Sequence, residues 1–222
     1  MNKSLMGWLM RLKKIDDLTR PDHYYITPQD ECFYLGEYTP GVGFQHSPTN
    51  QRIANLKKDV SLRGTNQYVW KEREISACGR DLRAAFKVEA ISEVTWVPTP
   101  PSKAKGDPKY DDRIVRVLRE MTVGIRADVR EIVHQKESVR PSHLQSDRPR
   151  PAEIAANYRV DQEMLLPEPK LIGIVDDVLT AGSHFKAMKM VLEEYYPGVR
   201  TFGLFLARTE RQSALLKDFD DL

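Results

Sequence analysis

The sequence predicts an α/β protein built on a central parallel sheet that is flanked by helices. Two apolar segments, 171–175 (LIGIV) and 200–207 (RTFGLFLA), have the composition of buried strands, and a helical pattern over 183–195 lies between them. A strand, a helix and a strand in this order form the right-handed crossover of a parallel sheet. A third strand is expected at 94–98 (VTWVP), where a proline ends it and a long loop follows.

Composition limits the possible partners and compartments. The 222 residues include 34 basic and 32 acidic side chains, and the net charge of +2 gives no direct sign of nucleic-acid binding. The sequence contains neither an apolar run of about 18 residues nor a signal-peptide pattern, so we expect a cytoplasmic protein without membrane contact. Cys32 and Cys78 lack the CxxC spacing of a zinc site and do not form a disulfide framework.

The chain is expected to divide into an N-terminal extension, residues 1–88, and a main domain, residues 89–222. Aromatic residues, glycine and proline dominate 22–46, which indicates a short hairpin or an ordered loop. Helices are expected over 1–20, from Ser47 and Pro48 onward, over 70–86 and over 110–122.

Two segments of the main domain are less regular. Residues 125–133 (IRADVREIV) fit a strand or a helix, and we expect a strand in the second half. Residues 134–150 have few large apolar side chains and are locally basic, which is typical of a mobile loop.

The turn that follows the strand at 171–175 has the properties of a phosphate site. Ligands bind at the carboxyl ends of parallel strands, where helix N-termini present unpaired N–H groups. Glycine permits a positive φ, and small residues let an anion approach the backbone. We therefore expect amides and hydroxyls to bind a monophosphate at Thr180, Ala181, Gly182 and Ser183.

Asp176 and Asp177 lie between this strand and the turn, where carboxylates would repel a phosphate. Adjacent residues of a strand point to opposite sides, so the pair can hold vicinal hydroxyls or a metal-bound water while the turn holds the phosphate. A ribose 5-phosphate fits that arrangement. The alternative is that the two aspartates only begin a turn and cap the next helix. The spacing matches neither the phosphate loop of ATPases nor GxGxxG.

The segment 172–183 (IGIVDDVLTAGS) resembles the phosphoribosyl-pyrophosphate (PRPP) binding motif of type I phosphoribosyltransferases. That motif has a hydrophobic strand, two acids, two further residues, Thr, Thr or Ala, Gly, and Ser or Thr. His184 departs from the pattern, because many members carry a small or hydroxylated residue there, and its role stays open. The resemblance implies the sheet of that family, with a small N-terminal α+β extension or hood.

A second segment, 95–112 (TWVPTPPSKAKGDPKYDD), resembles a strand and the pyrophosphate loop of the same family, in particular of its ComF-type branch. The zinc-binding module at the N-terminus of that branch has no counterpart here. On this resemblance a flexible hood over 134–150 closes over the diphosphate, although each of its charges could equally be a solvated loop charge. The implied pyrophosphate-loop residues are Pro100, Pro101, Ser102 and Lys103, and the candidate lid residues are Lys136, Arg140, His143 and Arg148.

The resemblance implies displacement at the anomeric carbon of PRPP by an unidentified nitrogenous acceptor, with Mg²⁺ and release of pyrophosphate. Lys103 and the magnesium ion would neutralise the leaving group. Asp176 and Asp177 would orient the ribose hydroxyls and contact the metal through ligand or water, and one of them could accept a proton. Dimers are frequent in proteins that resemble this chain, so a homodimer is a candidate assembly.

Two other functions fit the same residues. The first is a non-catalytic module that senses PRPP or a nucleotide and acts with a protein partner, in DNA uptake or in defence against foreign DNA. The second is a phosphohydrolase or nucleotide-binding protein whose turn only imitates the motif. The loop with Pro100, Pro101, Ser102 and Lys103 argues against the second.

Overall fold

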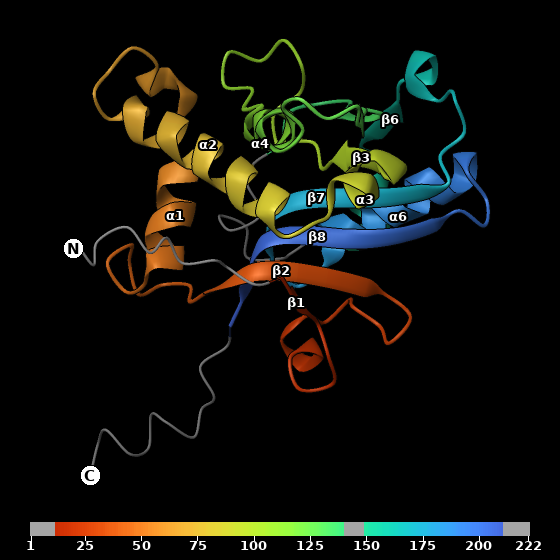
Figure 1. The fold of residues 1–222 in the computed structure, drawn as a ribbon, viewed down its shortest axis with the longest axis horizontal. Helices are drawn as coiled ribbons and strands as arrows, with labels where there is room; N and C mark the ends of the chain where they lie inside the picture. The colour runs from red at the N-terminus through yellow and green to blue at the C-terminus, as the bar shows by residue number, and fades with distance from the viewer. Residues whose placement is uncertain (1–11, 140–148, 211–222) are drawn as a thin grey trace.

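A computed structural model describes residues 12–139 and 149–210 and has a six-stranded central sheet (Figure 1). The strand order is β1-β2-β8-β7-β3-β4, and every pairing is parallel except that of β1 with β2. The sheet strands are β1 (Lys13–Lys14), β2 (Glu31–Tyr38), β3 (Thr95–Pro98), β4 (Asp128–Val129), β7 (Leu171–Leu179) and β8 (Arg200–Thr209).

Helices cover both faces of this sheet. Helices α1 to α4 lie on one face and α6 lies behind β7 and β8 on the other, where a small antiparallel hairpin and α5 pack beside it (Figure 1). The helices are α1 (Pro48–Leu56), α2 (Tyr68–Ala84), α3 (Val88–Glu93), α4 (Arg113–Met121), α5 (Pro151–Ala156) and α6 (Ser183–Tyr195), and the hairpin is β5 (Val133–Gln135) with β6 (Tyr158–Val160).

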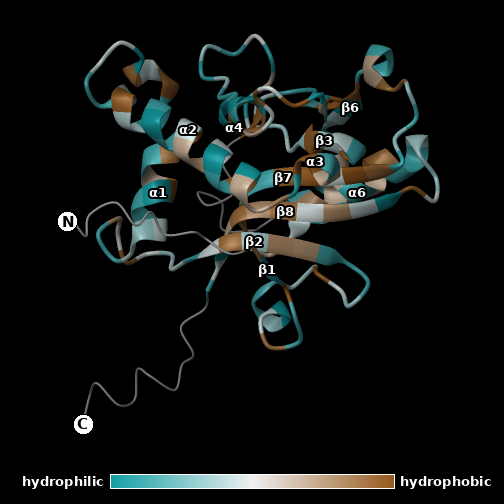
Figure 2. Ribbon diagram, in the orientation of Figure 1, coloured by the Kyte–Doolittle hydropathy of each residue, from teal (hydrophilic) through white to brown (hydrophobic). Residues whose placement is uncertain are grey.

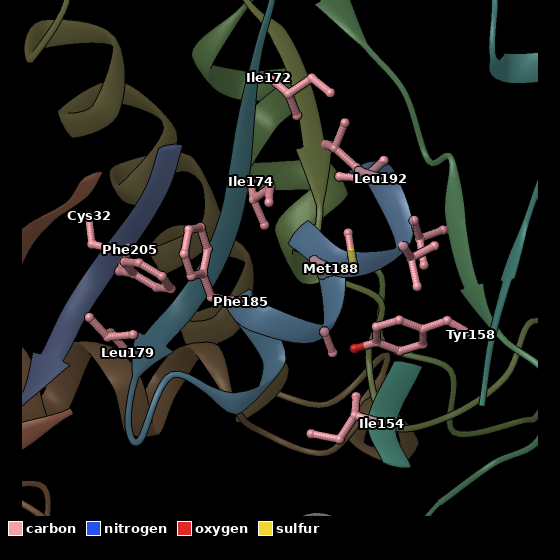
Figure 3. Close-up of a cluster of buried hydrophobic side chains, with 14 of the residues drawn as sticks. Cys32, Ile154, Tyr158, Ile172, Ile174, Leu179, Phe185, Met188, Leu192 and Phe205 are labelled. Carbon is pink, nitrogen blue, oxygen red and sulfur yellow. The ribbon is translucent and has the colours of Figure 1, made fainter. Parts of the chain in front are cut away.

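The hydrophobic core forms one layer on each face of the sheet. The middle parts of β2, β7 and β8 are mainly apolar, whereas the helices alternate between polar and apolar residues (Figure 2). On the α2–α4 face the ring of Trp96 packs edge-to-face on Phe202 and Phe86. On the other face Phe185 and Met188 of α6 fill the space between β8 and the β6 residue Tyr158 (Figure 3).

The sequence correctly predicted the crossover β7–α6–β8, the strand β3, and the helices α1, α2 and α4. Ser47 caps α1 as expected, because its hydroxyl accepts the N–H of Asn50. One boundary was wrong: β7 does not end at residue 175 but continues through Leu179, with Asp176 inside it. The reason is β8, which supplies a parallel partner for β7 as far as Arg208.

The N-terminal part differs more from expectation. The described end of the segment expected to be a helix, residues 12–20, contains β1 and a turn, and residues 1–11 lie outside the described part. Residues 22–46 do not form a separate hairpin. They contain β2, which pairs with β8 along its length, so strands from both sides of residue 88 share one sheet.

The irregular segments also contain more structure than composition suggested. Residues 125–133 hold β4 in their middle and the first residue of β5 at their end, so the strand expected in the second half is present only in part. Residues 134–135 complete β5, and α5 begins directly after the expected loop. In the described part of the chain no helix combines the length and the apolar composition needed to cross a bilayer.

Replacing Gly79 by Ala should destabilise the protein, although alanine is normally the better helix former. A Cβ at Gly79 of α2 would lie 2.9 Å from the backbone oxygen of Val117 in α4, too close without separation of the two helices. We expect the free energy of unfolding, measured with urea, to be about 1–3 kcal/mol lower than that of the wild type. Ser76→Ala, one turn earlier on the same helix, should be neutral or slightly stabilising. Equal effects of the two substitutions would contradict this account of the α2–α4 contact.

Candidate functional site

The pairing of β3 with β7 brings together the two segments that the sequence singled out. Pro98 lies opposite Val175 in the parallel register, and the amide of Thr99 donates to the carbonyl of Val175 at 2.8 Å. The loop at 99–112 therefore leaves the sheet beside Asp176 of β7, and the turn at 180–183 follows at the carboxyl end of β7. Open α/β sheets bind ligands at the carboxyl ends of their strands.

Asp177 lies on the α4 face of the sheet and is buried in ion pairs. Arg113 at the start of α4 donates to its Oδ2 from Nε at 2.9 Å and from Nη2 at 2.6 Å, and Nζ of Lys57 lies 3.2 Å from its Oδ1. Burial alone would raise the pKa of Asp177, but the charges of Lys57 and Arg113 outweigh it and hold the pKa well below its usual range. Asp177 is therefore ionised at neutral pH, with both oxygens in use.

The ion pairs continue from Arg113 into the helical layer. Its Nη1 donates to Asp111 at 2.8 Å, and the same carboxylate oxygen accepts a hydrogen bond from Nζ of the fully buried Lys71 at 2.6 Å. The chain Lys57–Asp177–Arg113–Asp111–Lys71 thus joins α1, β7, α4, the end of the loop at 99–112, and α2. Sequence reasoning missed this network, because Arg113 and Asp177 are 64 residues apart and no local pattern pairs them.

Asp176 has a different environment from its neighbour. It is partly exposed, and its Oδ1 accepts the backbone N–H of Asp177 at 2.7 Å. Burial, and then the negative charge of Asp177, raises the pKa of Asp176 to about 7. The two adjacent carboxyl groups therefore differ in charge and accessibility, although the sequence predicted the same roles for both. Only the proton affinity of Asp176 is suited to accepting a proton near neutral pH.

The turn at 180–183 has the backbone geometry that the sequence predicted for an anion cradle. Gly182 has φ +86° and precedes the first residue of α6, Ser183. Thr180 is exposed, Ser183 is partly exposed, and Ala181 is buried. Within the described residues the amides of Ala181 and Gly182, which are both buried, donate no hydrogen bond. The first turn of α6 adds its own unpaired N–H groups.

His184, the residue that departs from the phosphoribosyltransferase pattern, contacts the β5–β6 hairpin. The hydroxyl of Tyr158 lies 3.1 Å from its Nδ1. Figure 3 shows this hydroxyl directed toward α6. Burial lowers the pKa of His184, which therefore favours the neutral imidazole, and burial followed by the charge of Asp176 raises the pKa of Tyr158. Tyr158, which was not among the candidate site residues, is thus the neighbour of His184.

The proposed pyrophosphate loop is held against the segment that leads into the undescribed part of the chain. The carbonyl of Ser102 accepts the N–H of Val139 at 2.8 Å, and Oγ of Ser138 accepts the N–H of Ala104 at 3.1 Å. The same hydroxyl donates to Asp107 at 2.6 Å. Pro100 is buried, whereas Pro101, Ser102 and Lys103 are partly exposed.

Of the candidate lid residues, only Lys136 lies within the described part. Its Nζ donates to the carbonyl of Ala156 at 2.7 Å and its amide to that of Asn157 at 2.7 Å, so it joins the end of β5 to α5. Arg140, His143 and Arg148 lie outside the described residues.

The two predicted magnesium ligands, Asp176 and Asp177, have different environments in the structure. Among the described residues no three His, Cys, Asp or Glu side chains are grouped as a metal site. Asp177 has both oxygens in ion pairs, whereas Asp176 is partly exposed. Mg²⁺ commonly takes one or two carboxylates and completes its shell with substrate phosphates and water. Asp176 fits that limited role.

Comparison with known proteins does not identify a family. No family model matches the chain, and no curated protein matches its sequence. The assignment of function therefore depends on the site itself.

Removing Arg113 should destabilise the protein much more than removing a similar surface arginine. Arg113→Met leaves Asp177 buried with only Lys57 as a cation, and loss of one partner from a buried pair costs about 3–5 kcal/mol. Arg116, three residues later on α4, pairs with Glu72 where both side chains are partly exposed, so Arg116→Met should cost about 1 kcal/mol or less. Urea unfolding of both variants at neutral pH measures the difference. Similar costs would show that the Arg113 pair contributes no more than a surface pair.

The pKa of Asp176 predicts a pH-dependent effect of Asp176→Asn. Between pH 3.8 and about 7 the unfolded chain releases this proton and the folded protein retains it, so wild-type stability falls as pH rises. Asn keeps the acceptor for the Asp177 amide and has no charge. The variant should gain free energy of unfolding relative to wild type across that range, and the gain should be constant above it.

Asp177→Asn is the matched comparison and should have the opposite sign. Its lowered pKa means that the ionised carboxylate stabilises the wild type above the pKa of the unfolded chain. Urea unfolding from acid to mildly alkaline pH tests both variants. A difference for Asp176→Asn that is the same at all pH values would contradict the raised pKa.

Proposed function

We propose that this protein is a phosphoribosyltransferase of the type I fold: it binds PRPP with Mg²⁺ and transfers the phosphoribosyl group to a nitrogenous acceptor. The observation that carries the proposal is the pairing of β3 with β7. It brings residues 99–112 and the motif DDVLTAGS to the same end of the sheet, and this supports the proposal because the two halves of a PRPP site would have to be neighbours.

The chemical demands of the two ends of PRPP agree with the residues at this edge. The 5-phosphate needs backbone donors and a helix N-terminus, which the turn at 180–183 and α6 supply. The leaving diphosphate needs positive charge, for which Lys103 and a magnesium ion carried with the substrate are the candidates. A carboxyl group beside the ribose completes the set, and Asp176 has the exposure for this role.

The reaction needs a destination for one proton. The acceptor nitrogen forms a bond to the anomeric carbon as the bond to the diphosphate oxygen breaks, and the nitrogen then loses its proton. Asp176, whose pKa is raised to about 7, is the proposed proton acceptor. Asp177 contributes differently, because it stays ionised and fixes Arg113 and Lys57 at the edge of the site.

A second candidate is the non-catalytic PRPP or nucleotide sensor that acts with a protein partner. The observation in its favour is the ion pairing of Asp177, which occupies one of the two carboxylates that would orient the sugar. A sensor requires the phosphate turn and the pyrophosphate loop but no proton acceptor. The expected cytoplasmic location and a homodimer are compatible with both candidates.

Pyrophosphate release from PRPP, Mg²⁺ and a panel of nitrogenous acceptors distinguishes the two. The enzyme should release pyrophosphate with at least one acceptor, and Asp176→Asn and Lys103→Ala should each lower kcat/KM by about 10²-fold or more. Lys109→Ala, an exposed lysine of the same loop, is the control and should retain activity. No release with any acceptor, together with saturable PRPP binding, would instead support the sensor. Absence of PRPP binding would exclude both.

A further inference from the structure

The segment Asp22–Asp30, here called the strap, lies against the turn at 180–183. It enters β2 directly, and in Figure 1 it lies at the β2 side of the sheet. Three of its residues contact successive residues of the turn. Nδ1 of His23 is hydrogen-bonded to the carbonyl oxygen of Thr180, the amide of Tyr25 donates to the carbonyl of Ala181 at 2.8 Å, and the side chain of Ile26 packs on Gly182.

The strap is anchored at both ends by ion pairs in which one partner is buried. At one end Nη1 of the buried Arg208 lies 2.8 Å from a carboxylate oxygen of Asp22. At the other end the carboxylate of Asp30 has no exposed surface and pairs with Lys186 at 2.7 Å and Lys189 at 3.1 Å. Burial would raise the pKa of Asp30, but its hydrogen bonds with Lys186 and Thr27 outweigh burial and lower the pKa to about 2.

The basic residues that anchor the strap are on β8 and α6, which lie next to the turn. Arg208 lies opposite Leu179, the last residue of β7, in the β7–β8 register, and both lysines are on α6. The strap is thus fixed to β8, the neighbour of the strand before the turn, and to α6, the helix after it. Its position relative to the turn is determined at two points, and the contacts of His23, Tyr25 and Ile26 lie between them.

The strap determines where the amides of the turn point. In a trans peptide the C=O of one residue and the N–H of the next point in opposite directions. Because the carbonyls of Thr180 and Ala181 are bonded to the strap, the N–H groups of Ala181 and Gly182 are directed away from it. The carbonyl of Gly182 accepts the N–H of Lys186 within α6, so the N–H of Ser183 points out of the helix N-terminus. Three successive amides are therefore oriented by three bonded carbonyls.

We propose that His23 is a positioning residue for the phosphate-binding turn, and that through it the strap gives the site its selectivity for a phosphomonoester such as ribose 5-phosphate. A carbonyl oxygen can only accept, so His23 must carry a proton on Nδ1 to hold the Thr180 carbonyl. An anion bound by the turn then meets amides that need no reorientation, which is the benefit of preorganisation. This inference rests on the proposed function, because it assumes that the turn binds the phosphate of the substrate.

The test compares two ligands that use different ends of the site. Affinities for ribose 5-phosphate, and for inorganic pyrophosphate with magnesium, are measured by calorimetry for the wild type and for His23→Leu, which keeps side-chain volume but has no donor. We expect binding of ribose 5-phosphate to weaken by about tenfold, the worth of one well-placed hydrogen bond, and binding of pyrophosphate to stay unchanged.

Two further variants separate positioning from general damage to the fold. His23→Asn places an amide N–H close to the position of Nδ1. It should restore ribose 5-phosphate affinity to within about threefold of wild type, which on the free-energy scale recovers half of the tenfold loss. Tyr24→Ala, the neighbouring exposed residue, should leave both affinities unchanged. If His23→Leu does not fold, Asp22→Asn, which weakens the anchor to Arg208, should give the same selective loss.

The outcomes distinguish the inference from the function on which it rests. Equal ribose 5-phosphate affinity in His23→Leu and wild type, equal weakening of both ligands, or no rescue by Asn would overturn the positioning role and leave the proposed function intact. Failure of the wild-type protein to bind either ligand would overturn the proposed function, and the inference with it.

Discussion

The buried pair between Arg113 and Asp177 is the interaction on which the candidate site of this protein depends. A carboxylate inside a central strand is costly unless a cation compensates it. Arg113 provides that cation from the first turn of α4, and through Asp111 and Lys71 the same charge network reaches α2. The network fixes the distance between the helical layer and β7 at the end where the loop at 99–112 leaves the sheet.

The pair also explains why two adjacent aspartates can have different chemistry. Because neighbouring strand residues face opposite sides, the cations of α1 and α4 neutralise Asp177 directly and leave Asp176 on the other face. Burial, and then the negative charge of the ionised Asp177, raises the pKa of Asp176 to about 7. One carboxylate thus belongs to the buried ion pairs, and its charge contributes to the raised pKa of the other, on which the proposed proton transfer depends.

The sequence predicted those parts of the fold that depend on local patterns. The apolar segments of β3, β7 and β8 and the helical spacing of α6 were sufficient to place the motif on a parallel sheet. It did not predict the extension of β7 beyond residue 175, because the two aspartates interrupt the apolar pattern and their compensation comes from Arg113, far away in sequence. It also missed β2, whose neighbouring glycines and prolines resemble a loop while its strand character depends on pairing with β8.

The same limit applies to the phosphate turn, where residues that favour the conformation do not determine it. Gly182 permits a positive φ at low cost, but a permissive residue also allows the turn many other conformations. Restricting them requires partners for the carbonyls, and these come from a segment more than 150 residues earlier, in which His23 holds Thr180. The ion pairs of Asp22 and Asp30 connect that segment to α6, which follows the turn, and to β8, which pairs with the strand that precedes the turn. The turn at 180–183 thus contains the N–H donors, whereas the strap orients them through its bonds to the carbonyls of Thr180 and Ala181.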